Sequence, residues 1–162
     1  MKVAVIADTH LPRGSRRLPD ECVRRLESAE LILHAGDFSE LSVLRELEQL
    51  APVLGVLGNN DDAELGEILP RSRVAEIGGV RIAIVHEAGA RAGRARRLVG
   101  RFAGCEAVVY AHTHVAEVTR EDGVWVLNPG SPTERRRSPA RSMLELVVAE
   151  GELRPKVVTL SP

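Results

Sequence analysis

The chain has 162 residues, 44% of them hydrophobic and 28% charged, and a formal net charge of −1. This length suits one domain over residues 1–162, and the composition excludes both a disordered chain and a membrane partner, because no apolar run reaches the ~18 residues of a membrane span. Aromatic residues make up only 2%, and the balanced charge leaves no general basic footprint, so no stable nucleic-acid binding is expected.

The first part of the chain alternates short apolar runs with amphipathic segments. Residues 3–7, 31–35 and 52–57 are too short for helices and are typical of strands buried on both faces. Between them, the spacing predicts helices over 19–28, with Pro19 in the first turn, and from an N-cap at Ser39 to about Gln49. Because the first run directly follows Met1 and Lys2, no export signal is expected and a cytoplasmic location is predicted.

The later part of the chain reads mainly as strands. Residues 73–77 and 80–85 flank Gly78 and Gly79, which is typical of a hairpin. An arginine-rich segment with an apolar stripe predicts a helix over 91–102, and residues 107–110 predict another buried strand. Alternating segments at 115–120, 124–127, 142–148 and 152–159 predict a β-meander. The whole order indicates an α/β fold of two packed sheets with helices outside.

Five predicted strands end in side chains of the kinds that bind metals. These are Asp8-Thr9-His10, Asp37, Asn59, His86 and His112-Thr113-His114. In α/β folds ligands bind outside the carboxyl ends of strands, so these groups are expected to meet at one edge. Carboxylate, imidazole and amide groups form mixed sites that suit Mn, Fe, Zn, Co or Ni. Two such ions about 3.5–4 Å apart can activate water and clamp a phosphate, which predicts hydrolysis of phosphate esters.

The order D-x-H, G-D, G-N-x-D, H and H-x-H resembles the calcineurin-like metallophosphoesterases over nearly the whole chain. The short chain with Asn128-Pro129-Gly130-Ser131 is similar to their small bacterial and archaeal phosphodiesterase branch. The resemblance implies a four-layer α-β-β-α sandwich of two mixed sheets, and two divalent transition-metal ions, with Mn favoured over Ni, Fe, Zn or Co. It implies one ion on Asp8, His10, Asp37 and His114, and the other on Asp37, Asn59, His86 and His112. Asp37 would be the bridge.

Three positions depart from the pattern of the family. Many members have a histidine after the asparagine, where this chain has Asn60. An amide can donate a hydrogen bond but cannot supply a proton near neutral pH, so small phosphodiesters with acidic leaving alcohols are the expected substrates. Glu87 and Ala111 replace usual glycines, and Glu87 adds a carboxylate beside the expected metals. The resemblance thus implies attack by a metal-bridging hydroxide, with Asp37, Asn59, Asn60 and His86 as catalytic residues.

Each motif taken alone also has an ordinary explanation. Asp8-Thr9-His10 is a short match that arises by chance, and Asn59-Asn60-Asp61 is a common cap or Asx turn. His34 lies within a predicted strand and is expected to be a hydrogen-bonded core residue. The arginines at 13–17, 91–97 and 135–137 are most simply solvated surface, although the first and last groups follow candidate site loops.

Two other functions stay open at this stage. A non-catalytic interaction scaffold is one, since the retromer subunit that resembles this family has the same fold without clear catalysis. A phosphomonoesterase or nuclease is the other. The retained ligands argue against the scaffold, and the few aromatic residues argue against the nuclease. The sequence also permits a homo-oligomer.

Overall fold

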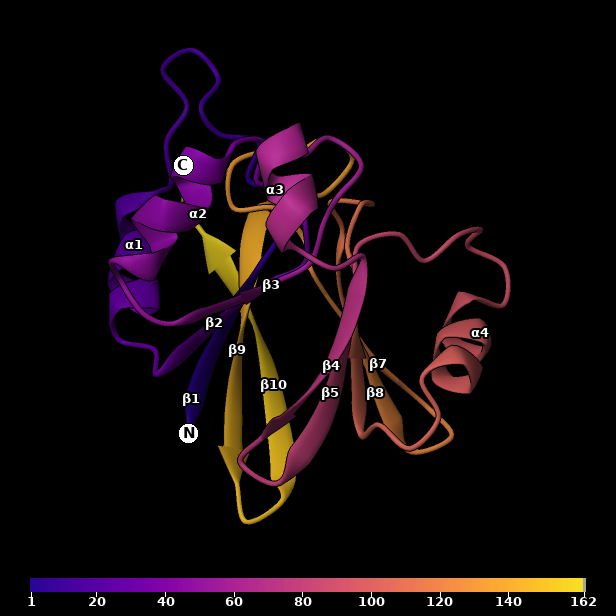
Figure 1. Ribbon diagram of the computed structural model, residues 1–162. Coiled ribbons are helices and arrows are strands. Elements are labelled where there is room, and N and C mark those ends of the chain that lie inside the picture. The colour runs from indigo at the N-terminus through magenta and orange to yellow at the C-terminus, as the bar shows by residue number, and fades with distance from the viewer. Residues whose placement is uncertain (162) are drawn as a thin grey trace.

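A computed structural model describes residues 1–161, which form ten strands and four helices (Figure 1). The strands are β1 (Lys2–Ile6), β2 (Leu31–His34), β3 (Val53–Gly55), β4 (Ser72–Ile77), β5 (Val80–Val85), β6 (Ala107–Val109), β7 (Ala116–Glu121), β8 (Val124–Pro129), β9 (Arg141–Ala149) and β10 (Glu152–Leu160). The helices are α1 (Asp20–Glu27), α2 (Leu41–Glu48), α3 (Ala63–Ile68) and α4 (Arg94–Arg101). None of the helices in this part of the chain has the length and apolar character needed to cross a bilayer.

The strands form two five-stranded sheets, and both sheets are mixed. The first has the order β10-β9-β1-β2-β3, in which β1, β2 and β3 are parallel and β9 runs antiparallel to both of its neighbours, β1 and β10. The second has the order β4-β5-β6-β8-β7, in which β5, β6 and β8 are parallel and the two edge strands are antiparallel. The prediction of two mixed sheets is therefore confirmed.

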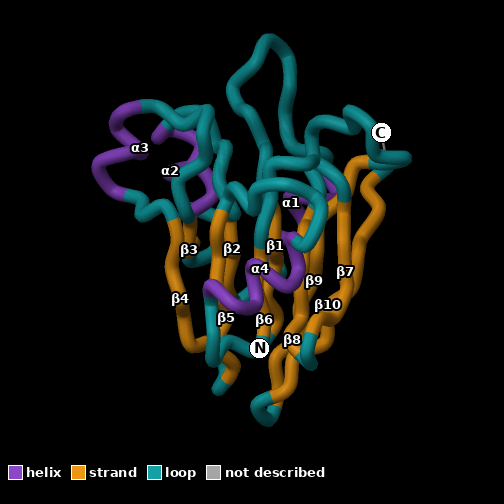
Figure 2. The backbone as a smooth tube through the Cα atoms, turned by 90° about the vertical axis from the view of Figure 1, so that its right-hand side faces the viewer, coloured by secondary structure: helices purple, strands orange, loops and turns teal. Residues whose placement is uncertain are grey.

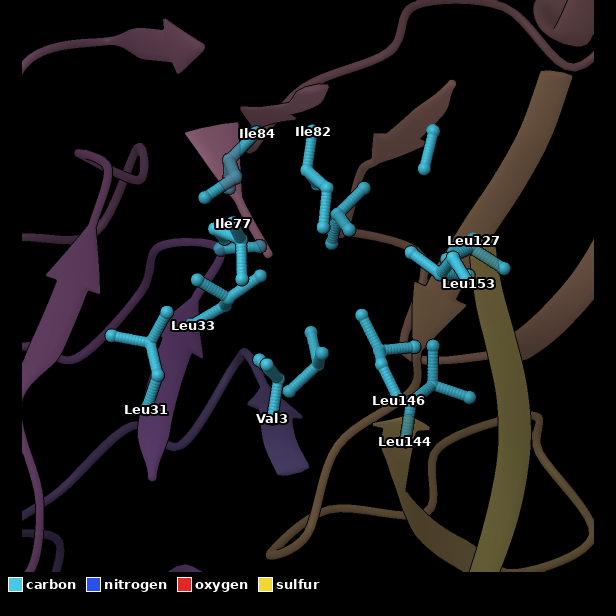
Figure 3. Packing of buried hydrophobic residues seen from close by; sticks show 14 of the residues in the cluster. Val3, Leu31, Leu33, Ile77, Ile82, Ile84, Leu127, Leu144, Leu146 and Leu153 are labelled. Atoms are coloured by element: carbon cyan, nitrogen blue, oxygen red, sulfur yellow. The ribbon is translucent and has the colours of Figure 1, made fainter. Parts of the chain in front are cut away.

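The main core lies between the two sheets. Figure 3 shows Val3 and Leu146 of the first sheet and Ile82, Ile84 and Leu127 of the second within one cluster. All five are buried. Successive strand residues point to opposite faces, so the intervening residues of β1 face away from this core.

Helices cover the outer face of each sheet, which completes the predicted four layers. Ile6 of β1 packs in a second cluster with Leu26 of α1, Leu47 of α2 and Leu65 of α3. On the other side, Leu98 of α4 belongs to a third cluster with residues of β5, β6 and β8. Figure 2 shows α4 lying across β5 and β6. Because both faces are covered, the central strands β1 and β6 carry continuous apolar runs at 3–6 and 107–109.

Several predicted details of the elements are wrong. The segments after residue 115 are not one meander, because β7 and β8 join the second sheet while β9 crosses to pair with β1. Helix α2 has Glu40 and not Ser39 as its N-cap, since Ser39 adopts a φ of 97°. Helix α4 begins at Arg94 because the Arg97 guanidinium bonds the carbonyls of 88, 90 and 92 and holds that segment as a loop. Helix α3, capped by Asp62, was not predicted.

Candidate metal centre

The candidate ligands lie at the carboxyl ends of parallel strands in both sheets. Asp8 follows β1, Asp37 follows β2, Asn59 follows β3, His86 follows β5, and His112 and His114 follow β6. The connecting loops gather at one end of the sandwich, at the top of Figure 2. The two sheets are joined there, because the His112 N–H donates to Asp8 Oδ2 at 3.1 Å and His86 Nδ1 lies 2.7 Å from the Ala35 carbonyl oxygen. Residues far apart in sequence thus meet at one edge.

Most of the candidate ligands have a backbone conformation that L-residues rarely adopt. Five of the seven have a positive φ, namely Asp8 (53°), His10 (47°), Asp37 (61°), His112 (73°) and His114 (61°). Such residues cost on the order of 1–3 kcal/mol each and persist only where the surroundings impose them. Main-chain bonds from Asp8 N to Gly36 O (3.0 Å) and from His10 N to Asp37 O (3.1 Å) impose them here. The strain is concentrated on residues whose side chains converge.

The first converging group consists of Asp8, His10 and His114, all buried. One ligand atom from each lies within 4.8 Å of the others. His114 Nε2 is 3.3 Å and His10 Nε2 is 3.8 Å from Asp8 Oδ1. Asp8 Oδ1 and His10 Nε2 are buried and have no hydrogen-bond partner within residues 1–161. Since an unpaired buried polar atom costs about 1–3 kcal/mol, this group fits a bound cation.

The second group consists of Asp37, His86 and His112, with Asn59 beside it. His86 Nδ1 contacts the Ala35 carbonyl, which can only accept, so we assign the proton to Nδ1 and leave Nε2 facing the site with its lone pair. That Nε2 is 2.9 Å from Asn59 Oδ1 and 3.4 Å from Asp37 Oδ2. Three acceptors that face one another repel unless a proton or metal ion lies among them. Carboxylate, imidazole and amide oxygen together suit a divalent transition metal.

Asp37 lies between the two groups. Its Oδ2 is 3.4 Å from His86 Nε2 and 3.5 Å from His10 Nε2, which belong to different groups. Burial raises the pKa of this carboxyl, but the hydrogen bond and charge of His86 and two N–H donors of Asn60 outweigh it and hold the pKa well below its usual range. Burial lowers the pKa of His86, but the Asp37 hydrogen bond and the charges of Asp8 and Asp37 outweigh it, so that pKa is raised. The field at Asp37 favours a cation.

Asn60 and Glu87 lie at the rim of these groups. Asn60 is exposed and bonds Asp37 twice, from its main-chain N to Oδ1 at 2.8 Å and from Nδ2 to Oδ2 at 2.9 Å. Glu87 is also exposed and, with Arg94, His112 and neighbouring residues, lines a pocket of about 230 Å³. Two of the three departures from the family pattern, Asn60 and Glu87, therefore lie beside the second group.

His34 has a structural role, as expected, and so does the segment 128–131 at the end of β8. His34 is fully buried, accepts from Gly36 N at 3.2 Å and lies 3.1 Å from Thr9 Oγ1, so it is a satisfied core histidine. Ser131 Oγ donates to the Asp8 carbonyl at 2.8 Å, and Asn128 Nδ2 donates to Thr113 Oγ1 at 3.1 Å. The segment 128–131 therefore supports two of the ligand loops.

Two carboxylates at the site have roles that the sequence did not predict, since Asp61 is predicted only as part of a cap or Asx turn and Glu134 belongs to none of the candidate motifs. Asp61 accepts from the backbone N–H groups of Asp37 (3.1 Å), Ser39 (2.9 Å) and Gly58 (2.7 Å), which ties the loops after β2 and β3 together. Glu134 Oε2 lies 3.3 Å from His114 Nδ1. Glu134 is the single acid among the arginines at 135–137, and that isolation is the signal that could have singled it out.

This chain is similar to several known proteins. The model of the calcineurin-like phosphoesterase superfamily domain matches residues 1–151. The chain is 38% identical over 138 residues to a protein named "Probable metallophosphoesterase" from Methanothermobacter thermautotrophicus, covering 84% of this chain and 80% of the relative. It is 28% identical over 144 residues to a phosphodiesterase of Methanocaldococcus jannaschii, covering 80% of this chain and 83% of that protein. Vps29 from Entamoeba histolytica, in a crystal structure complexed with Zn²⁺, shares the fold with a TM-score of 0.75 at 23% identity, over 99% of this chain and 100% of that one.

Proposed function

We propose that this chain, which belongs to the calcineurin-like phosphoesterase superfamily, hydrolyses small phosphodiesters at a centre for two divalent transition-metal ions. One observation carries the proposal: two adjoining groups of ligand residues, all buried except His112, meet at Asp37, and Asp8 Oδ1 and His10 Nε2 lie among them unpartnered within residues 1–161. When bound, two ions lower the pKa of water and stabilise charge on the attacking and leaving oxygens.

The proposed ligand sets follow the two groups. Asp8, His10, Asp37 and His114 would hold one ion, and Asp37, Asn59, His86 and His112 the other. The contacts of Asp37 Oδ2 with a histidine of each group support its proposed role as the shared ligand. The hydrogen bond of His86 Nδ1 to the Ala35 carbonyl supports Nε2 as its ligand atom. The donor set suits a divalent transition metal. Among these, the resemblance to the family favours Mn, with Ni, Fe, Zn and Co as alternatives.

Asn60, at the rim, is the residue that favours diesters over monoesters. It cannot give a proton to a departing alkoxide, so the leaving alcohol must be acidic enough to depart as the anion. Glu87 adds a carboxylate to the pocket beside His112, and Arg94 lines the same pocket with the opposite charge. The relative from Methanocaldococcus jannaschii that is named a phosphodiesterase lends further support.

The test compares metal-free and metal-loaded protein on matched substrates. Chelation should abolish hydrolysis of bis(p-nitrophenyl) phosphate, and added Mn²⁺ should restore it, with much lower turnover of p-nitrophenyl phosphate. Asp37→Asn keeps the shape of the side chain but removes the charge between the two groups, and it should lose both ions and the activity. Asp122→Asn, in the exposed β7–β8 turn, is the matched control and should behave as the unaltered protein.

The alternative functions correspond to distinct outcomes. Turnover by the metal-free protein would overturn the two-metal proposal. Bound metal without turnover of any ester, or no metal uptake at all, would favour an interaction scaffold. Faster hydrolysis of the monoester, or of single-stranded DNA, would favour a phosphomonoesterase or a nuclease.

A further inference from the structure

Glu134 is a nearly buried carboxylate on the far side of the first metal-ligand group. Its side chain is 12% exposed, and its Oε2 lies 3.3 Å from Nδ1 of His114, whose side chain is only 1% exposed. The other ring nitrogen of His114, Nε2, lies 3.3 Å from Asp8 Oδ1 and so faces the first group. The ring of His114 is therefore placed between two carboxylates, one within the proposed metal centre and one behind it.

The backbone around Glu134 is held against the loop that carries Asp8. The Glu134 N–H donates to Ser131 Oγ at 3.0 Å, and Ser131 Oγ donates to the Asp8 carbonyl at 2.8 Å. Thr133 Oγ1 donates to the Thr9 carbonyl at 2.8 Å. Ser131 and Thr133 are buried. These hydrogen bonds fix the position of the Glu134 backbone relative to the first group.

Three arginines hold the carboxylate in place. Arg16 Nη1 is 2.6 Å and Arg13 Nη1 is 3.6 Å from Glu134 Oε1, and Arg136 Nε is 3.0 Å from Oε2. Arg16 is itself only 23% exposed. A carboxylate paired with arginines stays ionised and acceptor-only, so its contact with an imidazole N–H is charge-assisted. The arginines that follow two of the site loops therefore act on Glu134 and are more than solvated surface.

Within residues 1–161, Glu134 is the one polar group paired with Nδ1 of the His114 ring. Nδ1 of His114 is buried and forms no hydrogen bond within residues 1–161, because its alignment with Glu134 Oε2, 3.3 Å away, is not that of a hydrogen bond. Contacts of this kind in ligand-free sites often shorten when the ligand binds. Metal-binding histidines almost always donate their second ring N–H to a carboxylate, carbonyl or water, which fixes the tautomer and the ring orientation. Glu134 is the acceptor that the fold supplies.

We infer that Glu134 is a positioning residue: it keeps the proton of His114 on Nδ1, so that Nε2 is free to bind the cation of the Asp8–His10–His114 group. The inference rests on the proposed two-metal function and adds a residue that none of the candidate motifs contains. Glu134 is not one of the proposed metal ligands. Its effect should be confined to one of the two groups, because its side-chain ion pairs within residues 1–161 are with Arg13, Arg16, Arg136 and His114, and none is with Asp37, His86 or His112.

The test measures metal affinity and the state of the His114 ring in the full chain. Stepwise Mn²⁺ affinities from chelator competition should fall about 10-fold for one ion in Glu134→Gln and up to ~100-fold in Glu134→Ala, while the other ion is bound as before. Glu64→Gln, on the exposed face of α3, is the matched control and should change neither affinity. Equal weakening of both ions, or no weakening, would overturn the inference.

A second readout does not depend on metal uptake. In the metal-free protein above pH 8, ¹⁵N shifts of the His114 ring should report a protonated Nδ1, and the population should move toward Nε2–H in Glu134→Ala. A ring that is already Nε2–H in the unaltered protein would overturn the inference. If the unaltered protein binds no ions, the proposed function fails, and the ring tautomer alone then decides the role of Glu134.

Discussion

Gly58 offers the sharpest perturbation of the centre, because its backbone lies directly against Asp37. A Cβ added at Gly58 would overlap Asp37 Oδ1 and Asp37 N and would stand 2.8 Å from Asp37 Cγ. Two of these three atoms belong to the carboxylate that lies between the proposed ions, and the third is backbone. Real Cβ contacts essentially never fall under 3.0 Å, so Gly58→Ala must displace Asp37.

The cost follows from how little can move. Forcing a methyl group into a packed region costs about 1–3 kcal/mol, and the upper part of that range applies because a backbone nitrogen cannot rotate away. At about 2–4 °C per kcal/mol for a chain of this length, the melting temperature of the metal-free protein should fall by about 5–10 °C. Both metal affinities should fall as well, because the displaced carboxylate contacts both groups.

Gly66→Ala is the matched control. Gly66 lies within α3, and a Cβ there meets nothing within 4 Å. The same substitution should therefore stabilise this helix by up to about 1 kcal/mol and leave metal binding unchanged. Thermal unfolding of the metal-free proteins and calorimetric titration with Mn²⁺ measure both effects. If Gly58→Ala has the same melting temperature as the unaltered protein and binds two ions with the same affinities, the close approach of Gly58 to Asp37 is wrong.

Three further expectations concern the same loops. In metal-free protein the His86 ring should titrate above pH 6.5 by NMR, and a midpoint below pH 6.5 would contradict this. Because the pKa of the folded state is raised, the contribution of His86 to stability should be complete below pH 6.5 and should be lost as the pH rises through the raised pKa. Asp61→Asn leaves one side-chain oxygen for three backbone N–H groups, so the free energy of unfolding measured in urea should fall by about 1–3 kcal/mol. An unchanged urea midpoint would refute the role given to Asp61. Mn²⁺ at 100 times its dissociation constant should stabilise the fold by about 2.7 kcal/mol, whereas equal melting with and without chelator would exclude binding to the folded state.

The positions of the candidate ligands could be predicted because they depend on local pattern. Apolar runs such as 3–7 and 31–35 are buried on both faces, and a charged or imidazole side chain directly after such a run must lie at the end of the strand. That reasoning placed Asp8, Asp37 and His86 at one edge without a structure. It failed where local signals compete, as at Ser39, whose N–H is bonded by the distant Asp61 and whose φ of 97° excludes a normal cap.

The sequence alone determined the order of the strand ends and the kinds of ligand atom, because strand burial and the polar residues that end strands are encoded within a few residues. The two mixed sheets were expected only from the resemblance to the family. Only the tertiary structure decided that β9 returns to pair with β1, that Asp37 touches both histidine groups and that Glu134 stands behind His114. These contacts join residues between 20 and 145 positions apart. No local periodicity records such pairs, since they arise when two sheets pack and bring separate loops to one edge.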